Sequence, residues 1–114
     1  MKKELNTTRL VEDIIIKYLE RNYLVDFKCA ANTELTAYYH GEKSKEEIEE
    51  VSAICLEDVF DEDTAQGIWE GIYTDLIPCA AYYDYDEVTD MVERAALRLL
   101  KHLIRTGIER GEYV

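Results

Sequence analysis

The chain has 114 residues, of which 47% are apolar, so it is long and apolar enough for one domain with a buried core. Its 25 acidic and 13 basic residues give a formal net charge of -12, which disfavours direct binding to nucleic acid or to an anionic membrane. No apolar stretch reaches the roughly 20 residues that a membrane span needs, and no signal-like segment follows Met1, so we expect a cytoplasmic protein.

The first predicted element is a helix from Thr8 to about Asn22. Ile16 lies off its apolar stripe, so we expect Ile16 to be exposed or to meet another part of the molecule. The stripe itself repeats at helical spacing and consists of Leu10, Val11, Ile14, Ile15, Tyr18 and Leu19.

The next predicted element is a β-hairpin, because apolar and polar residues alternate within 23–29 and again within 35–40. Residues 31–33, with the sequence Ala-Asn-Thr, form the predicted turn, and Gly41 ends the hairpin. An isolated two-stranded hairpin is marginal in water, so we expect it to pack on the helices. The alternative is an all-helical bundle in which residues 23–40 are irregular or helical.

Two further helices are predicted between the hairpin and Pro78. Ser44 and Glu47 have the spacing of a capping box and open the first of them. The acidic run at 61–63 ends this helix and starts the second, which Pro78 stops or interrupts. The GxxxG sequence at 67–71 predicts a close approach to another element of the fold.

The last predicted helix begins at Asp84 and extends to about Thr106, with Gly107 at the position of a C-terminal glycine cap. Residues 108–114 are expected to form a loose tail. The predicted fold is therefore a single α+β domain over residues 1–114. The residues expected to face inward on the last helix are Val88, Met91, Val92, Ala95, Leu99 and Leu103.

The acidic residues concentrate in the middle of the chain. Residues 42–93 contain seventeen acids and two bases, whereas residues 94–114 contain five bases and two acids. Acids near helix starts complement the macrodipole and acidic surfaces favour solubility, which is the alternative explanation for their number. Because such a density repels itself and lowers stability, we interpret it as a surface for a basic partner.

Tyrosine supports the same interpretation, since the chain has nine of them and tyrosine is enriched at protein interfaces. Three tyrosines lie among acids in the connection before the last helix. The predicted partner-binding residues are Glu46, Glu49, Glu50, Glu57, Asp58, Asp61, Glu62, Asp63, Tyr82, Tyr83, Asp84, Tyr85 and Asp86.

In charge, in size and in the Tyr82-Tyr83 pair beside acids, the chain is similar to small acidic inhibitors of nucleic-acid enzymes. These include phage DNA-mimic proteins that block restriction or CRISPR effectors, and the immunity proteins of nuclease bacteriocins. The similarity is one of composition and covers no aligned motif, so it transfers no residue roles. It implies a non-enzymatic inhibitor whose carboxylates imitate DNA phosphates and occupy a basic groove of a nucleic-acid-processing protein.

A basic stripe of Arg94, Arg98, Lys101 and Arg105 follows the last helix at spacings of four, three and four. We expect it to be solvated, or neutralised by the acidic segment of the same chain. The alternative is a contact surface for self-association, used together with the edge of the hairpin. The second candidate function is therefore a small oligomeric accessory or adaptor protein.

No catalytic, cofactor or metal site is predicted, and we expect the protein not to be an enzyme. His40 and His102, the only histidines, lack a serine, cysteine or carboxylate at a catalytic or zinc-binding spacing. Cys29, Cys55 and Cys79 form neither a CxxC pair nor an even set. We interpret them as small buried hydrophobic residues in a reducing compartment.

Overall fold

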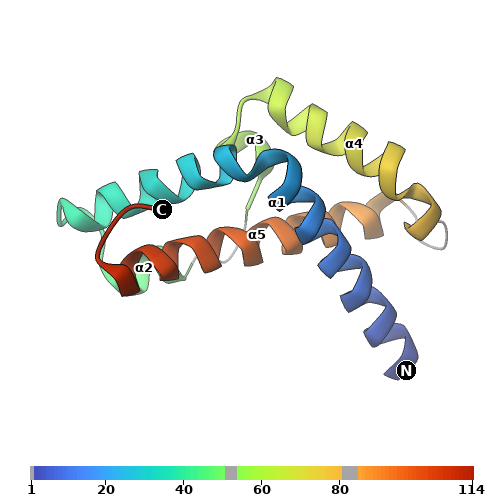
Figure 1. Ribbon diagram of the computed structural model, residues 1–114, viewed down its shortest axis with the longest axis horizontal. Helices are drawn as coiled ribbons and strands as arrows, with labels where there is room; N and C mark the ends of the chain where they lie inside the picture. Colours follow the sequence, from blue (N-terminus) through green and yellow to red (C-terminus); the bar gives the residue numbers. More distant parts are fainter. Residues whose placement is uncertain (1, 51–53, 81–84) are drawn as a thin grey trace.

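The computed structural model describes the backbone of residues 2–50, 54–80 and 85–114, and the side chains of residues 9–50, 54–72, 74 and 86–114. In chain order these residues form α1 (Lys2–Tyr39), α2 (Lys45–Glu49), α3 (Leu56–Val59), α4 (Glu62–Ala80) and α5 (Tyr85–Arg110), as Figure 1 shows. No strand occurs in this described part of the chain. The predicted α+β class is therefore wrong, and the fold is all-α, with α1 and α5 as its main packing pair.

The predicted hairpin is in fact the second half of α1. Phe27, Ala31 and Leu35 are fully buried at spacings of four, whereas Val25 is 73% exposed. In a strand, Val25 and Phe27 would lie on the same face, but a helix places them about 200° apart. The alternation between residues 23 and 29 is thus accidental, and burial follows the helical period.

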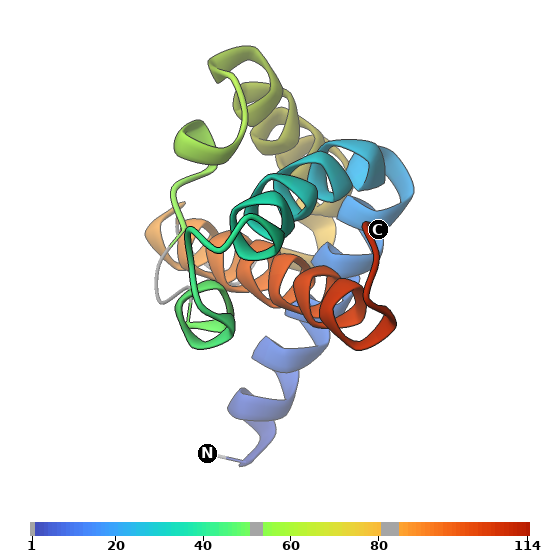
Figure 2. The same cartoon turned by 90° about the vertical axis from the view of Figure 1, so that its left-hand side faces the viewer.

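A break in the backbone at Tyr23 divides α1 into two halves. Tyr23 has φ -133° and ψ 19°, which are not helical values. Apart from Tyr23, which is partly buried, the residues at every fourth position from Val11 to Leu35 are buried, and in a straight helix such a stripe rotates by about 40° per step. The break lets the first half of α1 cross α5 while the second half runs beside α5 (Figures 1 and 2).

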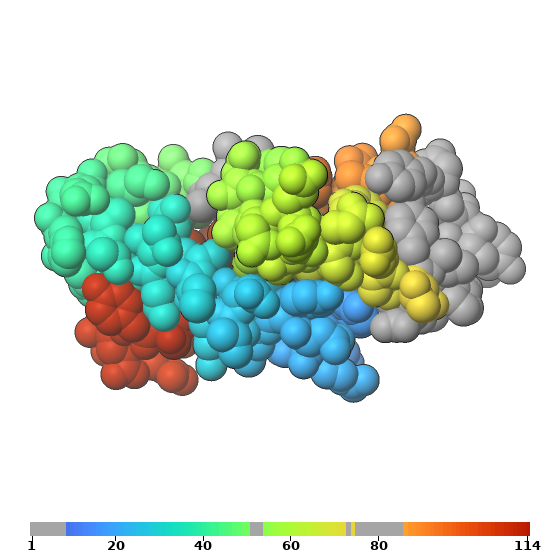
Figure 3. Space-filling model, turned by 90° about the horizontal axis from the view of Figure 1, so that it is seen from above, coloured from blue at the N-terminus to red at the C-terminus, as the bar shows by residue number. Residues whose placement is uncertain are grey.

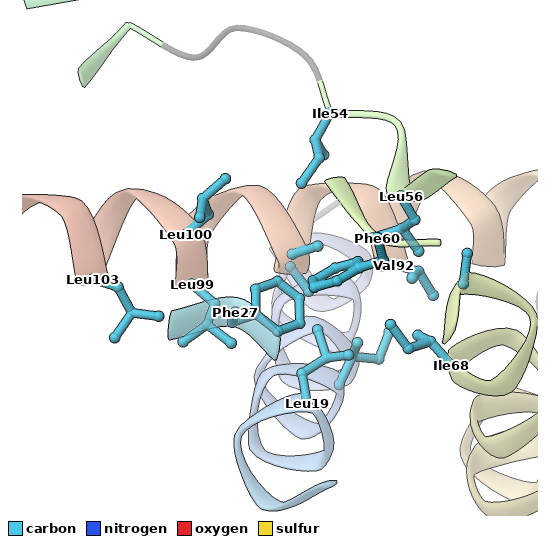
Figure 4. Packing of buried hydrophobic residues seen from close by; sticks show 14 of the residues in the cluster. Leu19, Phe27, Ile54, Leu56, Phe60, Ile68, Val92, Leu99, Leu100 and Leu103 are labelled. Atoms are coloured by element: carbon cyan, nitrogen blue, oxygen red, sulfur yellow. The ribbon is translucent and has the colours of Figure 1, made fainter. Parts of the chain in front are cut away.

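The core lies where α1, α3, α4 and α5 meet, and Figure 4 shows part of it. The rings of Phe27 and Phe60 meet edge to face with their centroids 5.0 Å apart. Leu19, Ile68 and Val92 lie close to these rings. The inward face predicted for the last helix is confirmed, since all six of its residues are buried.

The helix predicted from the Ser44 capping box is much shorter than expected. The box itself is present, because the Glu47 N–H donates to Ser44 Oγ at 3.1 Å and the Ser44 N–H donates to Glu47 Oε1 at 3.3 Å. The helix ends at Glu49, however, and the next helix starts only at Leu56. One continuous helix would place Ile48 and Ile54 about 120° apart, yet both are buried.

Close approach at the GxxxG sequence is confirmed. A Cβ built at Gly67 would lie 3.3 Å from the Tyr23 hydroxyl, and one at Gly71 would overlap the Tyr18 hydroxyl. Both glycines therefore let α4 pack directly against tyrosines of α1. No described helix is both long and apolar enough to cross a membrane.

The end of α5 also differs from the prediction. The helix continues to Arg110, and Gly111, with φ +67°, takes the capping position that the sequence assigns to Gly107. The Glu112 N–H then donates to the Gly107 carbonyl at 3.1 Å, as in a Schellman cap. Gly41, with φ +75°, ends α1 in the same way, since the Glu42 N–H donates to the Ala37 carbonyl at 2.8 Å.

Residues 108–114, expected to be a loose tail, complete α5 and then fold back along α1 (Figure 1). The Val114 N–H donates to Asn32 Oδ1 at 2.9 Å, and Asn32 Nδ2 donates to the Val114 carbonyl at 3.1 Å. The described tail is therefore tied to α1 by a pair of hydrogen bonds.

Candidate functional site

Nine of the predicted partner-binding acids belong to described residues, and they sit on segments along one side of the molecule, with α2 toward the end where α5 finishes and the first turn of α5 toward the other end (Figure 1). Figure 2 shows α2, α3 and the first turn of α5 along one side of the molecule, with the start of α4 above them. In Figure 3 the surface of α3 and the start of α4 is continuous. We call the acids of these segments the acidic side: Glu46, Glu49, Glu50, Glu57, Asp58, Asp61, Glu62, Asp63 and Asp86.

The local cause of this arrangement is a succession of helix starts. The first turns of α2, α3, α4 and α5 each carry two acids. Acids are favoured at these positions because the helix macrodipole is positive there. Since α2 and α3 have only five and four residues, successive helix starts follow each other closely. The fold thereby brings acids from the first turns of several helices onto one side of the molecule, whereas a single helix has only one first turn.

Asp61 is an acid of the acidic side whose pKa is shifted by its neighbours. Its Oδ1 accepts a hydrogen bond from the Thr64 N–H at 2.7 Å, so Asp61 is the residue of the acidic run at 61–63 that caps α4. Hydrogen bonds from the backbone and then from the side chain of Thr64 hold the pKa of Asp61 below its ordinary value. The capping role therefore favours the charged form of this carboxyl.

The acidic side has no internal counterions in the described structure. All of its nine carboxylates are exposed except that of Glu49, which is half-buried, and none forms an ion pair with a described residue. Lys43, one of the two bases in residues 42–93, instead pairs with Glu34 of α1 at 3.1 Å. The charge of these nine carboxylates thus has no counterion among the described residues.

The basic stripe is neutralised in part, but by different acids from those expected. Arg94 Nε lies 3.3 Å from Glu12 Oε2, and Arg98 Nη1 lies 3.5 Å from Glu12 Oε1 and 3.4 Å from Asp13 Oδ1. Both acids belong to the first half of α1. The prediction that the acidic segment would neutralise the stripe is therefore wrong for these two arginines.

The rest of the stripe borders a cavity of about 470 Å³ between α1 and α5. We call it the basic groove. Sequence reasoning found the stripe but missed the groove, because its other wall comes from α1, more than 75 residues earlier in the chain. The residues that line the groove are Ile16, Glu20, Arg98, Leu99, Lys101, His102 and Arg105.

The predicted aromatic part of the site falls outside the described residues. Tyr82, Tyr83 and Asp84 are not described, and Tyr85 opens α5 without a described side chain. The structure therefore brings together the acids of the prediction and does not place its tyrosines.

A different tyrosine cluster, not predicted, joins the ends of α1 and α5. Tyr39 lies 5.3 Å from Tyr38 and 5.4 Å from Tyr113 between ring centroids. Its hydroxyl is within hydrogen-bonding distance of the carbonyls of Gly107 (3.0 Å) and Glu112 (3.2 Å). Burial, followed by the nearby Tyr38, Tyr113 and Glu112, raises the pKa of Tyr39. The adjacent Tyr38-Tyr39 pair before Gly41 was the available sequence signal.

Two further predictions change with the structure. The hairpin edge does not exist, so it offers no surface for self-association. Cys29 and Cys55 are exposed free thiols, which makes their predicted burial wrong, and the side chain of Cys79 lies outside those described. Among the described side chains, no group of three histidine, cysteine or acidic residues could hold a metal ion.

Comparison of the chain with protein-family models, with curated proteins and with solved structures finds no match. The function therefore has to be argued from the surface of this chain alone.

Proposed function

We propose that this chain is a non-enzymatic inhibitor whose acidic side occupies a basic groove of a nucleic-acid-processing protein. The observation that carries the proposal is that nine carboxylates along one side of the molecule have no counterion among the described residues, while Arg94 and Arg98 of the same chain pair with acids of α1.

Electrostatic cost supports a role for these acids beyond solubility. A concentration of carboxylates without counterions repels itself and destabilises the fold. The chain has cations that could relieve this repulsion, but Lys43, Arg94 and Arg98 pair with acids of α1. A basic partner would supply the missing counterions, and its lysines and arginines would be steered toward the acidic side.

The dimensions of the molecule are compatible with mimicry of a short duplex. Its longest extent is 45 Å, which corresponds to about 13 base pairs at roughly 3.4 Å per step. Along the long axis the order is α2, α3 and then the first turn of α5 (Figure 1), and all three lie on the same side of the molecule when it is viewed end-on (Figure 2). A groove that accommodates DNA phosphates would therefore meet carboxylates over a comparable length.

The test is inhibition of DNA cleavage, with restriction endonucleases, CRISPR effector nucleases and bacteriocin nucleases as the panel. We expect the full chain to compete with DNA for at least one of them, with an affinity that falls steeply between low and high salt. The double reversal Glu57→Lys/Asp58→Lys should weaken inhibition roughly 100-fold, because both introduced charges would be repelled by the basic groove.

The matched control is Glu42→Lys/Glu109→Lys, which changes the net charge equally at exposed positions off the acidic side. It should retain most of the inhibition. Equal losses for the two double variants would mean that net charge alone acts, and no inhibition across the panel would reject this class of partner.

A further inference from the structure

The basic groove is a second site candidate, and it uses none of the acids in the proposed function. It forms where the first half of α1 crosses α5, a geometry that depends on the break at Tyr23 (Figure 1). Its volume of about 470 Å³ lies within the roughly 300–1,000 Å³ typical of small-molecule sites. Size alone would admit many ligands, so the charges of the lining decide between them.

The lining is positively charged even though the whole chain has a net charge of -12. Three cations, Arg98, Lys101 and Arg105, come from α5, and Glu20 of α1 is the one acid among the lining residues. Of these three cations, Arg98 already forms ion pairs with Glu12 and Asp13. The groove therefore offers a local excess of positive charge.

Lys101 and Arg105 are the two cations available to a ligand. Neither forms an ion pair with a residue that the structure describes. They are four residues apart on one helix, so their side chains are neighbours and repel each other. An anion held between them would remove this repulsion, and the Arg105 guanidinium presents a planar fork that matches phosphate oxygens.

The rest of the lining indicates that the anion carries an apolar body. Ile16 is partly buried and packs against the core, and Leu99 is buried beneath the groove. Ile16 is the residue that lies off the predicted stripe of the first helix, and here it meets the groove. An aromatic or aliphatic group could cover Ile16 while its charged end meets Lys101 and Arg105.

We propose that the basic groove binds an organic phosphate monoester. A phosphate monoester has a charge of about -1.5 to -2 at pH 7, which matches Lys101 and Arg105, two cations without a described ion-pair partner, better than a single carboxylate does. Its three terminal oxygens can accept hydrogen bonds from Lys101 and Arg105 together. This inference is independent of the proposed function, and either can fail without the other.

The experiment titrates the full ¹⁵N-labelled chain with phenyl phosphate, inorganic phosphate and benzoate at constant ionic strength. Phenyl phosphate should bind saturably, with a Kd of about 1 mM or tighter, and should shift the amide signals of Lys101, His102 and Arg105. Inorganic phosphate, which lacks the apolar body, and benzoate, which has one charge, should both bind more weakly.

The double variant Lys101→Gln/Arg105→Gln should weaken phenyl phosphate binding about tenfold or more, because each lost cation removes a charge-assisted hydrogen bond. The control Lys45→Gln/Arg110→Gln removes two exposed cations outside the groove and should leave the affinity unchanged. Thermal melts of both variants check that each is folded.

Three results would overturn the inference. They are no saturable binding of phenyl phosphate, equal affinity for benzoate or inorganic phosphate, and equal losses in the two double variants. Shifts in these residues that depend on protein concentration rather than on ligand would instead identify the groove as a contact between copies of the chain.

Discussion

The acidic side and the basic stripe are both dense in one sign of charge, yet the fold treats them in opposite ways. The stripe lies on α5, which is a helix of the core. From there Arg94 and Arg98 form ion pairs with Glu12 and Asp13 of α1. The acidic side is built from helix starts on the surface, where no described base pairs with it. Charge density in a sequence therefore does not tell which charges the fold will neutralise.

The difference follows from how each region is built. Ion pairs across packed helices form because the core already fixes both helices, so little additional entropy is lost. The acidic side receives its carboxylates from helix capping, a local preference that does not supply counterions. A surface built in this way keeps its charge for solvent or for a partner.

The largest expected effect comes from removing the contact that ties α3 to α1. Phe27→Ala should lower the free energy of unfolding by about 3–5 kcal/mol, because the ring is fully buried and packs against Phe60. Val25→Glu should change it by less than about 0.5 kcal/mol, since Val25 is exposed. Urea denaturation of both variants measures the contrast.

A hairpin at residues 23–29 predicts the opposite result for Val25. Both side chains would then share the buried face, and Val25→Glu would destabilise the protein as strongly as Phe27→Ala does. Comparable losses in the two variants would contradict the helical assignment.

A smaller difference in the free energy of unfolding should distinguish variants of the basic stripe from variants of the acidic side. Arg94→Gln/Arg98→Gln should lower the free energy of unfolding by about 1 kcal/mol, because both arginines lose exposed ion pairs to α1. Glu57→Gln/Asp58→Asn should change stability by less than about 0.5 kcal/mol, because the lost macrodipole interaction at the start of α3 and the relieved repulsion oppose each other.

Salt provides the check on this comparison. In thermal melts, added sodium chloride should reduce both differences, since screening weakens attraction and repulsion alike. Destabilisation by more than about 2 kcal/mol in the acidic-side variant exceeds what the macrodipole accounts for, would show that these carboxylates have internal partners, and would remove the main support for the proposed function.

The smallest expected effect concerns pH and the tyrosine cluster. The raised pKa of Tyr39 means that the folded state holds this proton more tightly than the unfolded state. The contribution of Tyr39 to stability is therefore complete below about pH 10 and is lost as the pH rises through its raised pKa. Tyr39→Phe should flatten this alkaline loss in thermal melts at pH 8–11, and an unchanged pH profile would contradict the assignment.

The sequence by itself determined the elements whose signals are local. The inward face of the last helix, from Val88 to Leu103, repeats at one clear period, and the Ser44 capping box and the Gly67–Gly71 approach follow from residues close in the chain. Most acids of the candidate site could also be predicted from the sequence, because the first turn of each helix from α2 to α5 carries two acids.

Only the tertiary structure decided the second half of α1, the partners of the arginines and the basic groove. Residues 23–40 fit two periods, and packing against α5 selects the one that buries Phe27, Ala31 and Leu35. The pairs of Arg94 and Arg98 join residues more than 80 positions apart. Such contacts depend on the break at Tyr23 and on the crossing of two helices, and local propensity encodes neither.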